Sequence, residues 1–309
     1  IDEAGLIAIG AQECEYATET DNTCQDEWVH SISLAIGGSH VLVRADMLGQ
    51  MRLGIWARME VVASIMAHST DSVATGIGNV MANKGGVATA LWIWNTPILF
   101  VNSHLAAHQN ETKRRNMDYS NIVGGLQMGS YPGCDILQVF EHIVWMGDLN
   151  YRLDFPAEIF GEGANAKTPP KELFAHIKEL VARNQTSVLL AQDQLRAACA
   201  RNESFVGFSE ADITFVPTFK VMRQEGVEYT TQRAPAYCDR ILWKSVSYLK
   251  VDCSEFWSGA SVSSSDHKPV GARITLELRP ARPRWWPQIF SKIAVSQRRQ
   301  RSAVIALIQ

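Results

Sequence analysis

The sequence has no apolar run close to the ~20 residues that a membrane-spanning helix needs, and its amino terminus lacks the basic and then apolar pattern of a secretion signal. Its six cysteines lie far apart without a Cys-x-x-Cys pair, so neither a zinc site nor a disulfide scaffold is indicated. A Cys-x-x-x-x-x-Arg phosphate loop is also missing, which excludes that thiolate chemistry. These absences predict a soluble or peripheral protein of the reducing cytoplasm.

Positive charge is scarce over most of the chain. The formal net charge of the 309 residues is −3, and seven basic residues but no acidic ones fall within 279–309. Residues 1–278 therefore carry a net charge of −10. Because binding to a nucleic-acid backbone requires a basic face, we expect no nucleic-acid partner.

Short apolar or β-branched runs predict many strands. They cover residues 5–10, 40–44, 54–64, 86–94, 97–103, 142–146, 240–244 and 271–278. Helical patterns are fewer, and the clearest lie at residues 111–127, 170–182 and 187–202. Strands with intervening helices in one unit predict an α/β or α+β sandwich. Beyond Leu278 the composition changes to prolines, arginines and tryptophans, which predicts a basic tail or linker over 279–309.

The strongest local signal is the stretch 145–152, Trp-Met-Gly-Asp-Leu-Asn-Tyr-Arg, in which an apolar strand ends at a glycine. Positions i and i+2 of an extended segment point to the same side, so Asp148 and Asn150 can face one ligand. Asp148 would then act as a general base toward water, and Asn150 as a donor to a phosphate oxygen. A simple Asp-x-Asn turn that closes the strand is an equally open alternative.

Other polar residues also stand where predicted strands begin or end. Glu13 and His104 each follow a strand, whereas Asp239 and the pair Asp266-His267 each precede one. Strand ends on one edge of a sandwich converge in space, so these side chains are candidates for one site. A carboxylate in such a place suits Mg²⁺, which prefers oxygen ligands. The set indicates metal-assisted attack by water on a phosphoester.

In this order, the motifs resemble those of the inositol polyphosphate 5-phosphatases, a branch of the DNase I-like endonuclease/exonuclease/phosphatase superfamily. The resemblance extends from Ile7 to Leu278. The matching segments are 9–13 (IGAQE), 83–88 (NKGGVA), 102–108 (NSHLAAH), 115–119 (RNMDY), 147–152 (GDLNYR), 215–220 (FVPTFK), 235–243 (PAYCDRILW) and 265–270 (SDHKPV). The resemblance implies an α+β fold, a four-layer α/β/β/α sandwich, with residues 1–278 as the catalytic domain.

The resemblance also implies an activity and a cofactor. The activity is Mg²⁺-dependent hydrolysis of the 5-phosphate of phosphoinositide lipids, soluble inositol polyphosphates, or both. Glu13 would be the Mg²⁺ ligand, Asp148 would activate the attacking water, and Asn150 and His104 would hold the scissile phosphate. The likeness further implies a cytoplasmic protein, peripherally associated with the cytosolic face of membranes.

The remaining catalytic residues would complete the site from the last two motifs. His267 would donate to the developing charge, Asp239 would orient its ring, and Asp266 would lie close to the metal and the nucleophile. The family reads the neighbouring phosphates with polar and cationic side chains. The candidates here are Lys220 and Arg233 for the 4-phosphate, and Lys84, His108, Arg115 and Asn116 for the 1-phosphate side. For Arg115, a plain helix-surface arginine is the alternative.

The chain also departs from the family pattern. The family's first strand would precede Ile1, so we expect the sheet to lack that strand here. Thr231 stands where the family often has a 4-phosphate lysine, Phe219 replaces a frequent tyrosine and Tyr237 replaces the usual tryptophan, which indicates weaker recognition of a 4-phosphate. The alternatives are a catalytically impaired phosphoinositide-binding module, or a nuclease or sphingomyelinase-like phosphodiesterase of the same superfamily.

Two segments could contact a membrane surface. In the basic tail, arginines alternate with aromatic residues over 282–290, which suits an anionic leaflet as well as an ordinary linker. On the rim of the site, Phe155, Ile159 and Phe160 are apolar residues between Arg152 and the next helix. We expect these three side chains to meet lipid.

Overall fold

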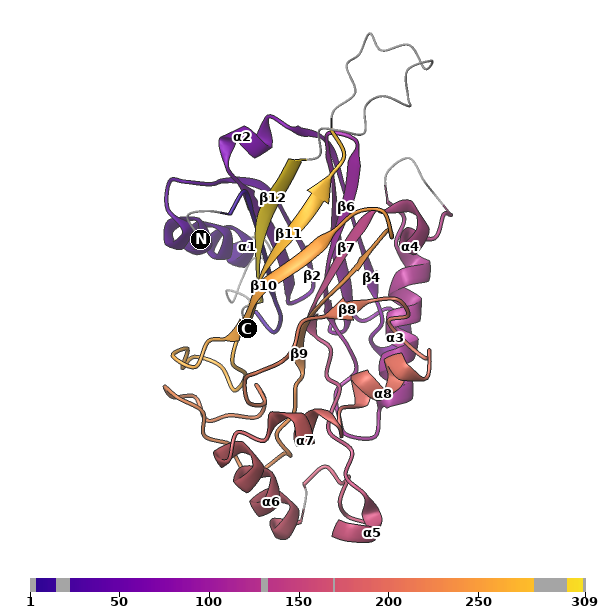
Figure 1. Ribbon diagram of the computed structural model, residues 1–309, viewed down its shortest axis with the longest axis vertical. Coiled ribbons are helices and arrows are strands. Elements are labelled where there is room, and N and C mark those ends of the chain that lie inside the picture. The colour runs from indigo at the N-terminus through magenta and orange to yellow at the C-terminus, as the bar shows by residue number, and fades with distance from the viewer. Residues whose placement is uncertain (1–3, 15–22, 129–132, 169, 281–298, 308–309) are drawn as a thin grey trace.

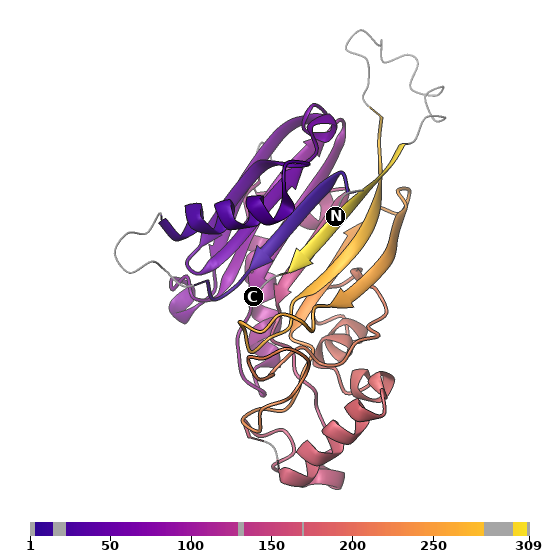
Figure 2. The same cartoon turned by 90° about the vertical axis from the view of Figure 1, so that its left-hand side faces the viewer.

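The computed structural model describes residues 4–14, 23–128, 133–168, 170–280 and 299–307, which form two six-stranded sheets packed on each other (Figures 1 and 2). The first sheet has the order β10-β11-β12-β1-β3-β2, formed by Val251–Ser258, Val270–Leu278, Arg299–Leu307, Leu6–Ala11, Met51–Ala57 and Val41–Leu48. The second has the order β4-β5-β6-β7-β9-β8, formed by Ile65–Ala74, Gly85–Ile93, Thr96–His104, His142–Asp148, Asp239–Ser245 and Ser209–Glu210.

The main core fills the space between the two sheets. Leu53 and Ile55 of β3 pack there with Phe100 of β6, Val144 of β7 and Ile274 of β11, and none of these side chains is more than marginally exposed. Complete burial of a side chain of this kind contributes roughly 1.5–3 kcal/mol. Strands that are apolar on both faces are therefore held between two layers, as in β1, β3 and β7.

Helices cover the outer face of each sheet. Helix α1, Thr23–Ile36, packs Trp28, Val29 and Ile32 against Trp56 of the first sheet. On the second sheet the cover is formed by three helices, α3 (Thr112–Gly125), α4 (Ile136–Val139) and α8 (Gln194–Ala200). The result is the predicted four-layer α/β/β/α sandwich of the α+β class.

A smaller group of helices lies beyond one end of the sheets (Figure 1). It consists of α5 (Ala157–Phe160), α6 (Lys171–Ala182) and α7 (Thr186–Leu190), with a separate core around Leu173 and Ile177. Two short elements remain elsewhere, α2 (Met59–Val62) and the 3-10 turn η1 (Ile77–Asn79). Among the described residues, no helix is long and apolar enough to cross a membrane.

Strand β12 corrects the expectation for the end of the chain. Part of the segment predicted as a tail or linker over 279–309 is a strand, Arg299–Leu307, which lies between β11 and β1 and pairs with both. The sheet is therefore continuous at the place where we expected it to lack a strand. Two features explain why β12 pairs here. Its sequence over 303–307, Ala-Val-Ile-Ala-Leu, is apolar, and the edges of β11 and β1 would otherwise be unpaired. Residues 281–298, including the predicted membrane-contacting aromatics, lie outside the described residues.

Other elements differ from the sequence prediction in bounds. The helix expected over 187–202 is two helices, because Asp193 caps α8 by accepting a hydrogen bond from the backbone N–H of Arg196. The run 54–64 is a strand only to Ala57 and then becomes α2. Helix α1 and strands β4 and β10, which are half exposed and carry many polar residues, were not predicted.

Candidate active site

The candidate site lies at the strand ends of the second sheet, and sheet register builds its first row. His104 ends β6, Asp148 ends β7, and Asp239 begins the antiparallel β9. In the pairing, His104 is opposite Asp148, and Asp148 is opposite Asp239. Opposed residues on neighbouring strands lie roughly 5 Å apart, so three chemically active side chains meet without any loop to place them.

Asp148 is the centre of this row. Its carboxyl group is buried, and its Oδ2 lies 3.2 Å from Nε2 of His104, which also contacts Nζ of Lys84. Burial tends to raise the pKa of Asp148, but the hydrogen bond and charge of His104, together with His267, outweigh it and hold that pKa well below its ordinary value. Burial also lowers the pKa of Lys84. Asp148 is thus a carboxylate at neutral pH.

Asn150 supports Asp148 directly, which changes the role that we predicted for it. Its φ of 57° is a left-handed conformation that asparagine tolerates better than most residues. Its backbone N–H donates to Oδ1 of Asp148 at 3.0 Å, and its Nδ2 donates to Oδ2 of Asp148 at 3.0 Å and to the carbonyl of Leu105 at 3.1 Å. Both amide hydrogens are therefore used inside the protein. Asn150 orients Asp148 in this geometry and does not present a donor to phosphate.

Asp239 and His267 form the second half of the site. Nδ1 of His267 lies 3.1 Å from Oδ2 of Asp239, and the hydroxyl of Thr218 donates to the same oxygen at 2.5 Å. Burial would lower the pKa of His267, but the charge and hydrogen bond of Asp239, with smaller contributions from Asp148 and Asp266, raise it to about 9. Burial raises the pKa of Asp239, and the charge of His267 opposes that rise. Because each charge stabilises the other, the pair is a carboxylate facing an imidazolium at neutral pH.

Glu13 is the predicted metal ligand, and its surroundings fit a hard divalent cation. It follows β1, has a φ of 53°, and its side chain is 76% exposed, with Oε1 3.8 Å from Nε2 of His104. Below it, Asn102 of β6 donates to the carbonyls of Ala11 and Arg52 and so fixes the end of β1 against the second sheet. One atom each from Asp148, Asp239 and His267 lie within 4.8 Å of one another. Carboxylate oxygens dominate this donor set, which suits a hard cation.

Lys220 and Asp266 are paired with each other. Nζ of Lys220 lies 2.8 Å from Oδ2 of Asp266, and both side chains are about one quarter exposed. Burial tends to raise the pKa of Asp266, but the hydrogen bond of Lys220 and the charge of His267 lower it overall. Asp266 therefore neutralises Lys220, the lysine predicted to bind the 4-phosphate. The predicted place of Asp266 close to the metal and the nucleophile stays a prediction. Arg233 is half-buried, and it donates to the carbonyl of Gln232.

Arg115 and Asn116 do not face the site, which corrects two predicted substrate contacts. Arg115 is fully buried and donates to the carbonyls of Ala106, His108 and Gln109, the hydroxyl of Thr112 and the amide oxygen of Gln194. It is neither a phosphate ligand nor a surface arginine. Asn116 accepts a hydrogen bond from the hydroxyl of Tyr151 at 2.6 Å and contacts Glu203.

His108 lies on the loop whose backbone carbonyls accept hydrogen bonds from Arg115. It is exposed and has a φ of 81°. Burial lowers the pKa of His108, and so do the charges of Arg233, Lys167 and Arg152, so the imidazole lies among cations. Lys167 and Arg152, which we did not predict, therefore lie in the electrostatic surroundings of His108, a predicted substrate contact. The basic residue in the Gly147–Arg152 motif was the available signal for Arg152.

The three apolar rim residues differ in exposure, which the sequence did not show. Phe155 is buried in the core of α5, α6 and α7, and Phe160 packs against it with ring centroids 5.8 Å apart. Ile159 is 70% exposed. Of the three apolar residues expected to meet lipid, only Ile159 is fully presented to the outside.

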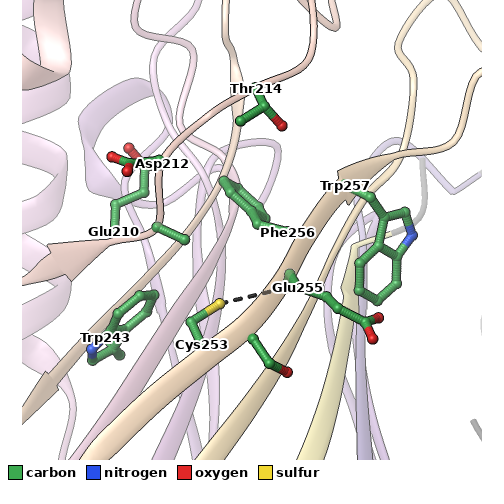
Figure 3. Close-up of a pocket in the computed structure, with 10 residues that line it drawn as sticks. Glu210, Asp212, Thr214, Trp243, Cys253, Glu255, Phe256 and Trp257 are labelled. Carbon is green, nitrogen blue, oxygen red and sulfur yellow. Dashed lines mark hydrogen bonds between the residues drawn. The ribbon is translucent and has the colours of Figure 1, made fainter.

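A separate concavity opens between the edge strands β8 and β10 (Figure 3). It has a volume of about 770 Å³ and is lined by Trp243, Phe256 and Cys253 on the strands and by Asp212 and Thr214 on the loop across from them. Trp243 is four residues along β9 from Asp239, or roughly 13 Å at the rise of a strand. This concavity is therefore not the candidate site, whose side chains meet at the strand ends.

The fold is a sandwich of two sheets. Its site combines two neighbouring carboxylates, a histidine paired with a carboxylate, and surroundings that fit a divalent cation. These features together are typical of a metal-dependent phosphoesterase. The model of the endonuclease/exonuclease/phosphatase family 2 matches residues 1–273. The chain belongs to that family.

Similar proteins are inositol 5-phosphatases. The chain is 34% identical to the mouse type II inositol 1,4,5-trisphosphate 5-phosphatase over 89% of this chain and 27% of that protein. It is 33% identical to the human phosphatidylinositol 3,4,5-trisphosphate 5-phosphatase 1 over 82% of this chain and 22% of that protein. The chain therefore spans about a quarter of the length of these relatives.

Solved structures show how far the fold is shared. The inositol polyphosphate 5-phosphatase domain of SPsynaptojanin, in complex with inositol (1,4)-bisphosphate and a calcium ion, has a TM-score of 0.71 at 24% identity and covers 99% of this chain and 76% of its own. The Cimex nitrophorin in its ferrous NO complex has a TM-score of 0.61 at 19% identity, covering 86% of this chain and 95% of its own. One fold thus serves unlike functions, so function must be argued from the site.

Proposed function

We propose that this chain hydrolyses the 5-phosphate of inositol phospholipids or soluble inositol polyphosphates with Mg²⁺ as its cation. The observation that carries the proposal is the row of His104, Asp148 and Asp239 with His267 behind it. A buried carboxylate that stays ionised faces an imidazolium, the arrangement that water attack on a phosphate requires. The names of the relatives supply the substrate class and the 5-position.

In the proposed reaction, Asp148 accepts a proton from water while the water oxygen forms a bond to phosphorus. The bond between phosphorus and the ring oxygen breaks, the leaving alkoxide takes up a proton from a second water, and Asp148 returns its proton to solvent. His267 donates to the phosphoryl oxygens as charge develops, and Asp239 keeps its ring in place. Lys84 would place a positive charge, and His104 a hydrogen-bond donor, beside the phosphoryl group. The cation, held at Glu13 among the neighbouring carboxylates, would neutralise phosphate charge.

The test is phosphate release from a short-chain phosphatidylinositol 4,5-bisphosphate and from inositol 1,4,5-trisphosphate, with and without Mg²⁺. Asp148→Asn keeps the shape of the side chain and removes the base, so we expect release to fall roughly 10²–10⁴-fold. Arg183→Gln, on the exposed end of α6, is the matched surface control. Equal release by Asp148→Asn and the wild type would refute the assignment, and a silent wild type with tight lipid binding would favour the binding-module alternative.

We further propose that the active-site rim contacts the cytosolic face of a membrane. The loop between β4 and β5 carries Ile77, which is 77% exposed, and Val80, which is 80% exposed, and it ends at Lys84. Ile159 of α5 is another exposed apolar side chain. Exposed apolar side chains next to a cationic site can insert at the boundary of the acyl chains while the cations bind the lipid headgroup. The five cysteines whose side chains the structure describes are free, which agrees with a cytoplasmic setting.

Replacing Ile77, Val80 and Ile159 with serine tests the membrane proposal. Because these side chains are exposed, the variant should fold normally and keep its rate on inositol 1,4,5-trisphosphate. On vesicles that contain phosphatidylinositol 4,5-bisphosphate, we expect a roughly 10-fold loss, since each buried CH₂ contributes about 0.8 kcal/mol. An equal loss on the soluble and the vesicular substrate would rule out a membrane role for these residues.

A further inference from the structure

Arg152 is a buried cation beside the site that the reaction outlined above does not use. It is 6% exposed, and its side chain contacts Asn150 and Phe219. Its Nη2 donates to Oδ1 of Asn150, and its Nε donates to the backbone carbonyl of Asn150 at 3.0 Å. Its guanidinium carbon lies 4.4 Å from the centroid of the Phe219 ring. A guanidinium held through two of its nitrogens and one of its faces has little freedom to move.

The first contact fixes the orientation of the Asn150 amide. An amide has an acceptor end and a donor end, and the cation of Arg152 attracts the acceptor. The donor end must then point the other way, to Asp148 at 3.0 Å and the carbonyl of Leu105 at 3.1 Å. If the amide rotated by half a turn, its NH₂ would meet the guanidinium and its oxygen would meet a carboxylate, which is unfavourable on both sides.

The second contact fixes Arg152 itself and reaches the other half of the site. The Phe219 ring is 8% exposed and packs beside the His267 ring, with centroids 4.6 Å apart. Phe219 also forms an isolated bridge with His267. One ring therefore supports the guanidinium that orients Asn150 and the imidazole that pairs with Asp239, so the two halves share a support.

We infer that Arg152 is a positioning residue that acts through Asn150 to hold the Asp148 carboxylate in its working orientation, with Phe219 keeping the guanidinium in place. The inference rests on the proposed hydrolysis, because that reaction needs Asp148 as its base. Groups that orient a reacting side chain affect turnover more than substrate affinity, since the orientation matters when the proton moves.

A double-mutant cycle on the soluble substrate tests the inference. Arg152→Met should lower kcat roughly 10-fold or more with KM changed less than about twofold. In an Asn150→Ala background the same change should cost less than about twofold, because its route to Asp148 is already lost. Arg152→Lys, which keeps a donor and a cation over the ring, should recover much of the rate. Phe219→Leu should reproduce part of the loss.

Lys178→Met is the matched control, because Lys178 also lies over a ring, that of Phe174 at 5.9 Å, but on α6. It should leave kcat and KM unchanged. A rise in KM with unchanged kcat in Arg152→Met, or additive losses in the cycle, would overturn the inference and make Arg152 a direct substrate contact or an independent structural residue.

The same four proteins, unfolded in urea, separate failure of this inference from failure of the proposed function. If the wild type releases no phosphate from any inositol phosphate, the proposed function fails, but the unfolding cycle still reports the contact. Non-additive changes in unfolding free energy between Arg152→Met and Asn150→Ala support the positioning arrangement. Additive changes overturn it whether or not the wild type turns over substrate.

Discussion

Two buried histidines at opposite ends of the sandwich show what makes a side chain reactive in this molecule. His142 begins β7, and its Nε2 donates to the carbonyl of Glu277 at 2.9 Å while its Nδ1 accepts from the hydroxyl of Ser245 at 2.8 Å. Burial lowers the pKa of His142. His267 lies beside the carboxylate of Asp239, and its pKa is raised to about 9. Burial is common to both, so the carboxylate decides which histidine carries charge.

The two ends of strand β7 show the same contrast between a neutral structural group and charged groups of the candidate site. At its first residue, β7 presents a neutral imidazole with both ring nitrogens bonded to neutral partners, which holds β7 against β9 and β11. At its last residue it presents the Asp148 carboxylate to His104, which also contacts Lys84. Neutral groups with hydrogen-bond partners stabilise the fold, whereas the charged groups that face one another at the other end are those to which we assign the proposed reaction.

The largest expected effect comes from removing the two histidines one at a time. His267→Asn should lower phosphate release roughly 10²–10⁴-fold, because a charged donor to the phosphoryl group is lost. His142→Asn should leave the rate within about twofold and instead lower the free energy of unfolding by about 1–3 kcal/mol, since a buried hydrogen-bonded group is changed. Steady-state kinetics with parallel urea unfolding measures both. Comparable rate losses in the two variants would end the distinction.

A second experiment sharpens the comparison by removing only the carboxylate. His267 donates when protonated, so the wild-type rate should persist to about pH 9 and fall above it. Asp239→Asn removes the charge that raises the pKa of His267. The pH above which kcat falls should therefore move toward 6.5, the ordinary pKa of histidine. At pH 9 the variant should then be slower than the wild type by roughly 100-fold. The measurement is kcat against pH, and a fall at the same pH in both proteins would show that Asp239 does not set this pKa.

Sequence reasoning found the row of the site because sheet geometry is regular. Residues at the ends of paired strands must meet, so the places of His104, Asp148 and Asp239 follow from three short motifs. The strand and helix pattern predicted a sandwich, whereas its four layers were implied by the family resemblance. Local pattern was sufficient wherever the regular repeat of an element did the positioning.

The sequence was a poor guide to the role of a residue where that role depends on a contact with a distant part of the chain. Arg115 looks like a surface or ligand-binding arginine until the carbonyls of the His108 loop surround it. Lys220 and Asp266 are 46 positions apart and neutralise each other only in the fold. Strand β12 took the place of an expected tail because pairing needs neighbours on both sides, which no local run of residues reveals.

The smallest expected effect is the dependence of stability on pH, in which the two histidines should act in opposite directions. The folded pKa of His267, about 9, lies above its ordinary value of 6.5, so its stabilisation is fully present below pH 6.5 and is lost as the pH rises from 6.5 to 9. The size is about 2 kcal/mol after allowance for partial solvent screening. The folded pKa of His142 is lowered, so its contribution is lost instead as the pH falls below 6.5, where the unfolded chain takes up a proton. Urea unfolding across this range should show that His267→Asn removes the alkaline slope alone and His142→Asn the acidic slope alone. If both variants lose the same slope, the environments of the two histidines do not differ as the structure indicates.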